Sequence, residues 1–370
     1  MIRVTYLIPT LDRSGAEKQL VLLATGLPRE EFEVSVIALT RGGPYAADLE
    51  AAGIPLAVIG KRWKLDPAAG LRLRREIDRQ QPDILHSWLF AANAYGRLVT
   101  RRQGGRPVMV VSERCVDSWK SGWQLRLDRR LIPRTDALIG NSRSVVDFYG
   151  KQGFPPERMC VIPNAVETPP MPSVSREELL GRLSLSNDVK LIGYAGRLAA
   201  QKRVADLLWG MQLLRQADSR SHLLILGDGP ERDRLIELSR KYECERHVHF
   251  MGHREDAASL LHHCDLFWLG SEFEGMSNSL MEAMACGKPV VVSDIPPNRE
   301  LVTHEVEGFV TGIGDGAGFA QFSRRLIDDE ALAQRMGEAG RDRMVREFCC
   351  ELVIKRHVDL YERFNQRSRE

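Results

Sequence analysis

The chain has 370 residues, 43% of them hydrophobic and 28% charged, and its formal net charge is only +2. This composition is that of a folded soluble protein, and the length exceeds one compact core and favours two domains of ordinary size. The seven cysteines show neither paired disulfide spacing nor a C-x-x-C metal clip, which excludes a disulfide scaffold and favours a reduced, cytosolic compartment.

The charge is divided unevenly along the chain. Residues 1–168 carry 25 Lys and Arg against 18 Asp and Glu, whereas residues 169–370 carry 27 against 32. The basic N-terminal half is therefore expected to meet something anionic. No apolar run approaches the ~18 residues that a membrane span requires. The apolar segment 1–11 lacks the charged region and cleavage site of a signal peptide, so we expect it to form a first strand.

Short apolar runs alternate with amphipathic stretches through the first half of the chain. The runs are 2–9, 33–40, 56–60, 83–88, 107–113, 137–142 and 160–165, and helical segments such as 16–26 and 67–80 lie between them. This alternation predicts an α/β domain with a mostly parallel sheet over residues 1–168.

The alternation stops at 167–175, which contains three prolines and is predicted to be a linker. It restarts with the runs 190–196, 222–228, 248–252, 265–270, 289–294 and 308–312. We therefore predict a second doubly wound domain over 169–350, with the ligand site in a cleft between the domains, beyond the carboxyl ends of the strands. The amphipathic segment 347–364 predicts a last helix, assigned with residues 351–370, that packs back across the domains.

The segment 271–289 places two carboxylates, Glu274 and Glu282, around a Gly-Met-Ser-Asn turn between two strand-like runs. The turn is expected to open a helix capped by Ser277 or Asn278, and such a helix N-terminus attracts anions. The carboxylates could then bind hydroxyls of a sugar nucleotide whose phosphates face the amides. Periodicity alone favours another interpretation, in which Glu282 is a solvated residue opposite an apolar helix face.

Several segments at predicted strand ends form an ordered set. They are SGAEKQL (14–20), DILHSW (83–88), NSRSVVDFY (141–149), VIPNAV (161–166), GYAGRLAAQKRV (193–204), LLILGDGPER (223–232), FMG (250–252) and 271–294. Together they resemble the retaining nucleotide-sugar glycosyltransferases of family 4, over nearly the whole chain. This resemblance implies the GT-B fold, in which two Rossmann-like domains face each other across a cleft. Glu274 and Glu282 match the family's E-x7-E signature, and Gly196, Arg197 and Lys202 match its Gly-Arg-x4-Lys element, which reverses the preference in favour of a functional site.

The resemblance also implies roles for individual residues. Arg197 and Lys202 bind both phosphates and stabilise the charge on the leaving group, as electrostatic catalysis requires. Glu274 accepts hydrogen bonds from the transferred sugar and Glu282 from the ribose. The donor also contacts the backbone amides of Met276, Ser277 and Asn278, while Asp228 and Arg254 are nucleotide-side contacts.

Two candidates lie in the first domain. Gly15 follows the first strand and lets the backbone approach a phosphate, although the family often has two glycines where this chain has Ser14-Gly15. His86 matches the family's D-x-x-H element, which implies contact with the donor sugar but no role as a general base. The alternatives are a simple tight turn and a structural histidine.

The resemblance implies a hexosyltransferase that uses a UDP- or GDP-linked sugar, retains the anomeric configuration and serves surface polysaccharide or glycolipid assembly. Attack occurs on the front face and the leaving phosphate takes the acceptor proton, so the two glutamates are not a glycosidase pair. The sequence shows no D-x-D motif or histidine cluster, so we expect no metal and no cofactor. The alternatives are a nucleotide-sugar epimerase of the same fold and a non-catalytic nucleotide-sugar binder.

The expected partners are the donor and a carbohydrate or lipid-linked acceptor, with no nucleic acid. The segment 119–134 mixes aromatic residues, leucines and five basic residues. It is typical both of a helix that rests on an anionic membrane or guides an anionic acceptor and of a solvated basic face. The expected location is the cytoplasm, with the cytoplasmic face of the membrane as an open alternative.

Overall fold

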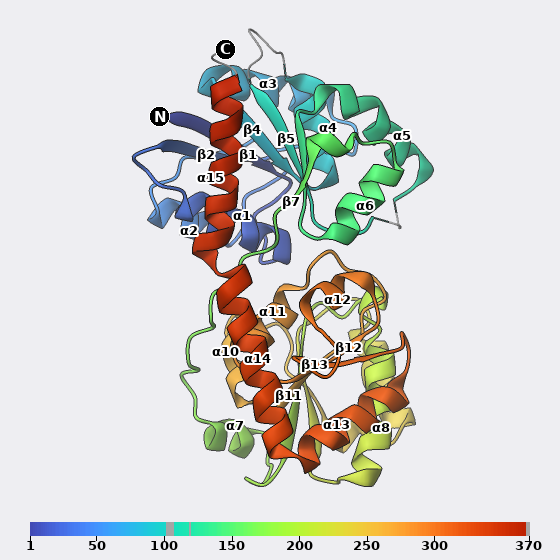
Figure 1. Ribbon diagram of the computed structural model, residues 1–370. Coiled ribbons are helices and arrows are strands. Elements are labelled where there is room, and N and C mark those ends of the chain that lie inside the picture. Colours follow the sequence, from blue (N-terminus) through green and yellow to red (C-terminus); the bar gives the residue numbers. More distant parts are fainter. Residues whose placement is uncertain (101–106, 118–119, 368–370) are drawn as a thin grey trace. The chain divides into compact units, whose positions relative to one another are not determined.

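The computed structural model describes residues 1–100, 107–117 and 120–367. The chain forms two compact units (Figure 1). The N-terminal unit comprises Met1–Ala165 and Cys350–Glu370, and the C-terminal unit comprises Val166–Cys349. No helix among the described residues is both long and apolar enough to cross a membrane.

The N-terminal unit is built on a seven-stranded parallel sheet in the order β3-β2-β1-β4-β5-β6-β7. The strands are β1 (Ile2–Ile8), β2 (Phe32–Ala38), β3 (Leu56–Val58), β4 (Ile84–Trp88), β5 (Val108–Glu113), β6 (Ala137–Gly140) and β7 (Met159–Val161). The helices are α1 (Gly15–Gly26), α2 (Ala46–Ala51), α3 (Pro67–Gln80), α4 (Leu89–Val99), α5 (Gly122–Leu131), α6 (Arg143–Lys151) and α15 (Cys350–Arg367), with the short 3-10 turns η1 (Ile132–Arg134) and η2 (Pro156–Arg158).

Both faces of this sheet are covered, which explains why its strands are continuous apolar runs. Residues of α1, α2 and α15 share one core with β1, and residues of α3, α4 and α6 share the other. The strand order reverses between β1 and β4, which is the switch point where doubly wound sheets bind ligands.

The C-terminal unit has a six-stranded parallel sheet in the order β10-β9-β8-β11-β12-β13. Its strands are β8 (Lys190–Ala195), β9 (Ser221–Leu226), β10 (Val248–Phe250), β11 (Leu266–Leu269), β12 (Val290–Ser293) and β13 (Gly308–Thr311). Its helices are α7 (Arg176–Arg182), α8 (Val204–Ala217), α9 (Arg232–Lys241), α10 (Ala257–Leu260), α11 (Asn278–Ala285), α12 (Pro296–Leu301), α13 (Gly316–Asp328) and α14 (Glu330–Phe348), with η3 (Ala200–Lys202), η4 (Glu245–His247) and η5 (Leu261–His263). The predicted pair of doubly wound α/β folds is confirmed.

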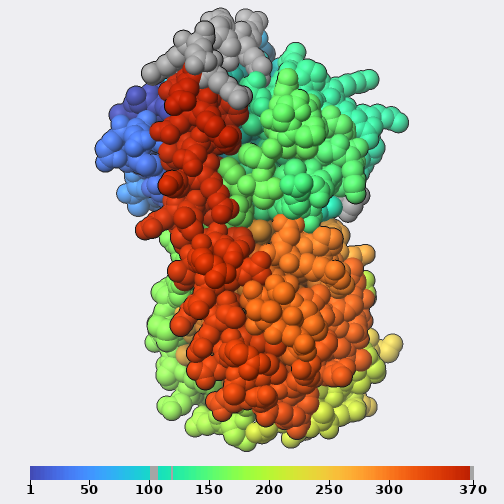
Figure 2. All heavy atoms as spheres, in the orientation of Figure 1, coloured from blue at the N-terminus to red at the C-terminus, as the bar shows by residue number. Residues whose placement is uncertain are grey.

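The C-terminal helix is interrupted where the sequence predicted one continuous helix over 347–364. Helix α14 ends at Phe348, Cys349 is extended at ψ 152°, and α15 begins at Cys350. Helix α15 belongs to the N-terminal unit and lies on its surface (Figure 2). Its inner face is fixed by Tyr361, whose hydroxyl lies 3.2 Å from that of Tyr6.

Candidate active site

Backbone hydrogen bonds join the loops that follow β8, β9 and β10 at the carboxyl ends of these strands, which we call one edge of the C-terminal sheet. Gly196 donates its N–H to Leu226 O at 3.0 Å, and Gly227 donates to Gly252 O at 2.8 Å. A Cβ on Gly227 would lie 2.0 Å from Gly196 O, and the φ of Gly227 is 154°. Only glycine permits this approach, which brings the Arg197 loop next to the Asp228 loop.

Arg197 is the exposed cation of this edge. It follows β8, its side chain is exposed, and its guanidinium makes no hydrogen bond or ion pair to any residue that the structure describes. Its backbone oxygen accepts a hydrogen bond from Tyr194 at 3.2 Å, which holds the loop. An exposed guanidinium held on a fixed backbone can bind a phosphate without first breaking an internal ion pair.

Lys202 and Glu274 form a largely buried ion pair at the same end of the sheet. The Lys202 ammonium donates to Glu274 Oε1, and the two side chains are 17% and 10% exposed. Ser271 also donates its hydroxyl to Oε1, at 2.7 Å. Oε2 has no partner within the described part of the chain, so it stays available to accept a hydrogen bond from a ligand.

A buried polar chain supports Glu274 from the interior of the unit. The Ser293 hydroxyl donates to Ser271 O at 2.5 Å, and the Asn298 amide donates to Ser293 O at 2.9 Å. Ser271, Ser293 and Asn298 are at most 1% exposed. The sequence analysis missed these residues, although a serine three positions before Glu274, directly after an apolar strand, was a usable signal.

Gln201 ties the lysine-bearing loop to the glutamate-bearing loop. Its side-chain amide donates to Phe273 O at 2.6 Å, and its own backbone oxygen accepts from Glu272 N at 2.9 Å. Lys202 and Glu274 are the next residues along each loop, so these two bonds fix the ion pair in register. Sequence reasoning did not identify Gln201.

Helix α11 begins where the sequence analysis placed it. Ser277 is the N-cap and accepts a hydrogen bond from Leu280 N at 3.4 Å, so the predicted cap is confirmed for Ser277, while Asn278 is the first helical residue. Met276 and Ser277 are buried, and Glu282 lies about one turn inside the helix on its partly exposed side. The arrangement provides helix N–H groups beside the Lys202–Glu274 pair.

Asp228 and Arg254 already have partners in the protein. Asp228 Oδ1 accepts from Gly229 N at 2.7 Å. The Arg254 guanidinium makes two hydrogen bonds to Asp256, at 2.8 and 2.7 Å, and these bonds lower the pKa of Asp256. Contact with a nucleotide would compete with these bonds.

Gly15 and His86 lie in the N-terminal unit. Gly15 is the first residue of α1, after the N-cap Ser14, whose hydroxyl donates to the buried Glu17. His86 is fully buried in β4, where Nδ1 lies 2.7 Å from the Tyr361 hydroxyl and Nε2 lies 2.7 Å from the Ser112 hydroxyl. Burial lowers the pKa of His86 well below its ordinary value. Both ring nitrogens of His86 are therefore occupied and its side chain is not exposed, so contact with a donor sugar would require these bonds to break.

The basic segment 119–134 exposes fewer cations than the sequence suggested. Trp119 lies outside the described residues, and Lys120 is completely buried, 2.9 Å from Asp117 and 3.1 Å from Asp128. Although burial alone would lower the pKa of Lys120, the surrounding carboxylates raise it. The exposed basic side chains of α5 are those of Arg126, Arg129 and Arg130.

Comparisons with known proteins agree with this architecture. The family model described as Glycosyltransferase Family 4 matches residues 13–169, and the one described as Glycosyl transferases group 1 matches residues 175–343. A glycogen synthase of Mycobacterium tuberculosis is 30% identical over 309 residues, which cover 79% of this chain and 72% of that enzyme. The lipopolysaccharide core biosynthesis glycosyltransferase LpsE of Rhizobium meliloti is 25% identical over 350 residues, covering 94% of this chain and 95% of that protein.

Solved structures show the same fold. The crystal structure of HepE from Anabaena in complex with UDP-glucose has a TM-score of 0.86 at 21% identity, over 98% of this chain and 100% of that chain. A sucrose-phosphate synthase from Thermosynechococcus elongatus has a TM-score of 0.83 at 16% identity, over 98% and 99%. These likenesses confirm the two-domain Rossmann-like GT-B fold. With both halves matched by glycosyltransferase models, the chain belongs to the family 4 glycosyltransferases.

Proposed function

We propose that this glycosyltransferase moves a hexosyl group from a nucleoside diphosphate sugar to an acceptor hydroxyl, with retention of the anomeric configuration. The observation that carries the proposal is the placement of Arg197, exposed and without a side-chain partner among the described residues, at the same end of the sheet as the Lys202–Glu274 pair and the N-terminus of α11. The bound UDP-glucose of the HepE structure supports a UDP-linked donor. Relatives named for lipopolysaccharide core and capsular polysaccharide biosynthesis support an acceptor in cell-surface carbohydrate assembly.

The reaction needs compensation for charge that develops on the leaving group. As the bond between the anomeric carbon and the phosphate oxygen breaks, negative charge grows on the nucleoside diphosphate, and Arg197 with Lys202 stabilises it. A phosphate oxygen then takes the proton of the acceptor hydroxyl, whose oxygen forms the new bond on the same face of the sugar. Two side-chain cations supply this compensation, so we propose that the reaction needs neither a metal ion nor a cofactor.

Glu274 has two tasks in this proposal. Through Oε1 it holds the Lys202 ammonium in place before the donor arrives, and through Oε2 it accepts a hydrogen bond from the transferred sugar. Glu282 would bind the ribose, and the amides of residues 276–278 the sugar and phosphate. Asp228, Arg254 and the Gly15 turn remain proposed contacts of the nucleotide and its phosphates.

The cysteines and the proposed acceptor both bear on the location of the protein in the cell. The structure keeps all seven cysteines as thiols, which supports the proposed location in the reducing cytoplasm. The proposed acceptor is a carbohydrate or a lipid-linked saccharide, and a lipid-linked acceptor would bring the enzyme to the cytoplasmic face of the membrane.

A panel of UDP- and GDP-sugars tests the proposal without a known acceptor. Each donor is incubated with the protein, nucleotide release is measured, and the sugar is analysed by NMR. The proposal predicts thermal stabilisation by one donor and slow hydrolysis in water; with methanol as the acceptor it predicts a methyl glycoside that keeps the anomeric configuration of the donor, because a glycoside, unlike the free sugar, does not mutarotate. Conversion of the donor without release would indicate an epimerase, and stabilisation without any turnover would indicate a binding protein.

A further inference from the structure

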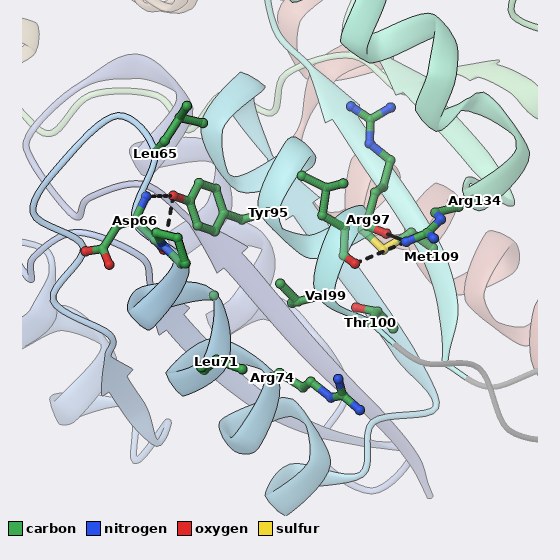
Figure 3. A pocket seen from close by; sticks show the side chains of 13 residues that line it. Leu65, Asp66, Leu71, Arg74, Tyr95, Arg97, Val99, Thr100, Met109 and Arg134 are labelled. Carbon is green, nitrogen blue, oxygen red and sulfur yellow. Dashed lines mark hydrogen bonds between the residues drawn. The ribbon is translucent and has the colours of Figure 1, made fainter.

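A cavity of about 860 Å³ opens between α3 and α4 of the N-terminal unit (Figure 3). Its apolar lining includes Leu65, Leu71, Leu98 and Val99, and the guanidiniums of Arg74 and Arg134 lie at its edge. The cavity is large enough for a drug-sized or lipid-sized group. None of the residues proposed to bind the donor lines it.

Large apolar side chains gather around this cavity and face solvent. Of the lining residues, Leu65 is 83% exposed, Leu71 58% and Leu98 49%, and Trp63, two positions before Leu65 in the same loop, is 66% exposed. Isolated exposed apolar residues are ordinary, but three at one opening, with a fourth in the adjoining loop, form a patch of the kind that contacts another molecule or a membrane.

Hydrogen bonds, rather than packing of the apolar side chains, fix the conformation of the loop beside the cavity. Asp66 caps α3 by accepting from Ala69 N at 2.9 Å, and it also accepts from Arg62 N at 3.0 Å. The Tyr95 hydroxyl of α4 accepts from Asp66 N at 2.7 Å. Trp63 and Leu65 can therefore stay outward on a fixed loop, ready to enter an apolar phase.

The same surface is basic. Lys61, Arg62 and Lys64 alternate with the apolar residues in the loop sequence Lys-Arg-Trp-Lys-Leu, and the Lys61 ammonium lies 5.5 Å from the centre of the Tyr95 ring. The Arg74 side chain lies at the edge of the cavity, 3.8 Å from Asp78. Among the described lining residues Asp66 is the only acidic one, and it is 3% exposed. The surface therefore complements an anionic partner.

We propose that this face, loop 61–65 with the cavity between α3 and α4, docks on a bilayer that contains anionic phospholipid. Trp63 and Leu65 enter the boundary between headgroups and acyl chains, where tryptophan is favoured. The cavity accepts the upper part of a phospholipid chain, and Arg74 and Arg134 meet its phosphate. Within the five residues of loop 61–65, cationic side chains are interspersed with apolar ones. Such a loop fits the surface of a bilayer, where charged headgroups and apolar acyl chains lie a few ångströms apart. This contact does not depend on the proposed transfer reaction.

Vesicle binding tests the inference. Full-length protein is sedimented with vesicles of phosphatidylglycerol and phosphatidylcholine, and with vesicles of phosphatidylcholine alone. We expect at least roughly tenfold tighter binding to the anionic vesicles, weakening as salt is raised. The double variant Trp63→Ser/Leu65→Ser should bind them at least roughly tenfold more weakly, a loss of about 1.4 kcal/mol. Lys64→Glu/Arg74→Glu should remove the preference for anionic lipid.

Trp123→Ser is the matched control, because Trp123 is 56% exposed on the basic helix α5 of the same unit. It should bind vesicles like the wild type. Quenching by brominated phosphatidylglycerol gives a local readout, and the quenched fraction should fall in Trp63→Phe. The inference is overturned if the wild-type protein ignores anionic vesicles, if Trp63→Ser/Leu65→Ser binds them normally while melting normally, or if Trp123→Ser alone abolishes binding, which would place the contact on α5.

Discussion

Replacement of Ser271 by alanine tests whether Glu274 must be held in one orientation. The change deletes the hydroxyl that donates to Glu274 Oε1 at 2.7 Å, while the bond from Ser293 to the backbone oxygen of Ser271 is retained. A hydrogen bond to a charged group contributes about 1.5–3 kcal/mol. Because Lys202 still holds Oε1, we expect the lower part of that range, and kcat/KM for nucleotide release should fall roughly tenfold.

Ser221→Ala is a matched control for this variant. Ser221 is also fully buried in the C-terminal unit, but its hydroxyl has no hydrogen-bond partner in the described structure. Its replacement should leave kcat/KM unchanged and should not lower the melting temperature. Steady-state kinetics on both variants, with melting curves to verify folding, decide the question. Normal kcat/KM in a folded Ser271→Ala protein would refute the orienting role of this hydroxyl.

Two further predictions concern the C-terminal unit. Gly227→Ala places a methyl group 2.0 Å from the backbone oxygen of Gly196, so it should destabilise the fold by several kcal/mol. In the control Gly252→Ala the new methyl group meets no atom within 4 Å, and the change should cost only about 1 kcal/mol of backbone strain. Equal melting temperatures of the two variants would contradict the close approach of Gly227 to Gly196. Burial lowers the pKa of His222 to about 4, with added repulsion from His247 and His249. In the unfolded chain the His222 imidazole titrates near pH 6.5, so the stability that the neutral side chain provides is complete above that pH and is lost progressively as the pH falls toward 4. Urea unfolding at pH 7.5 and 5 should show a smaller loss in His222→Gln, and an unchanged loss would contradict this assignment.

The architecture was predictable because its signals are local. Strands buried on both faces are continuous apolar runs, so 190–196 predicted β8, and the capping chemistry of Ser277 located the start of α11. The break between α14 and α15 was not predictable, because Cys349 has no intrinsic helix-breaking property. Its extended conformation accompanies hydrogen bonding between Val166 N and Phe348 O.

The site was predictable only in part. The strand-end charges Arg197, Lys202 and Glu274 are visible in the sequence through their motifs, and the structure brings their loops to one edge. The residues that hold these side chains in place, such as Ser271 and Gln201, are not visible in the sequence, because a serine or glutamine acquires its hydrogen-bond partner only through tertiary packing. His86 shows the same limit, since its partner Tyr361 lies 275 residues away in α15.

The most direct test of the central claim is the rate of nucleotide release from the preferred sugar nucleotide by Lys202→Ala. Lys202 is proposed to stabilise charge that appears as the sugar–phosphate bond breaks, and loss of one such interaction costs about 2.7–4 kcal/mol, so kcat should fall roughly 10²- to 10³-fold. Lys190→Ala is the control, because Lys190 opens β8 at the opposite edge of the sheet and lies 3.9 Å from Asp265. The account predicts near-normal kcat for Lys190→Ala and a severe loss for Lys202→Ala. Comparable kcat values in the two variants would contradict it.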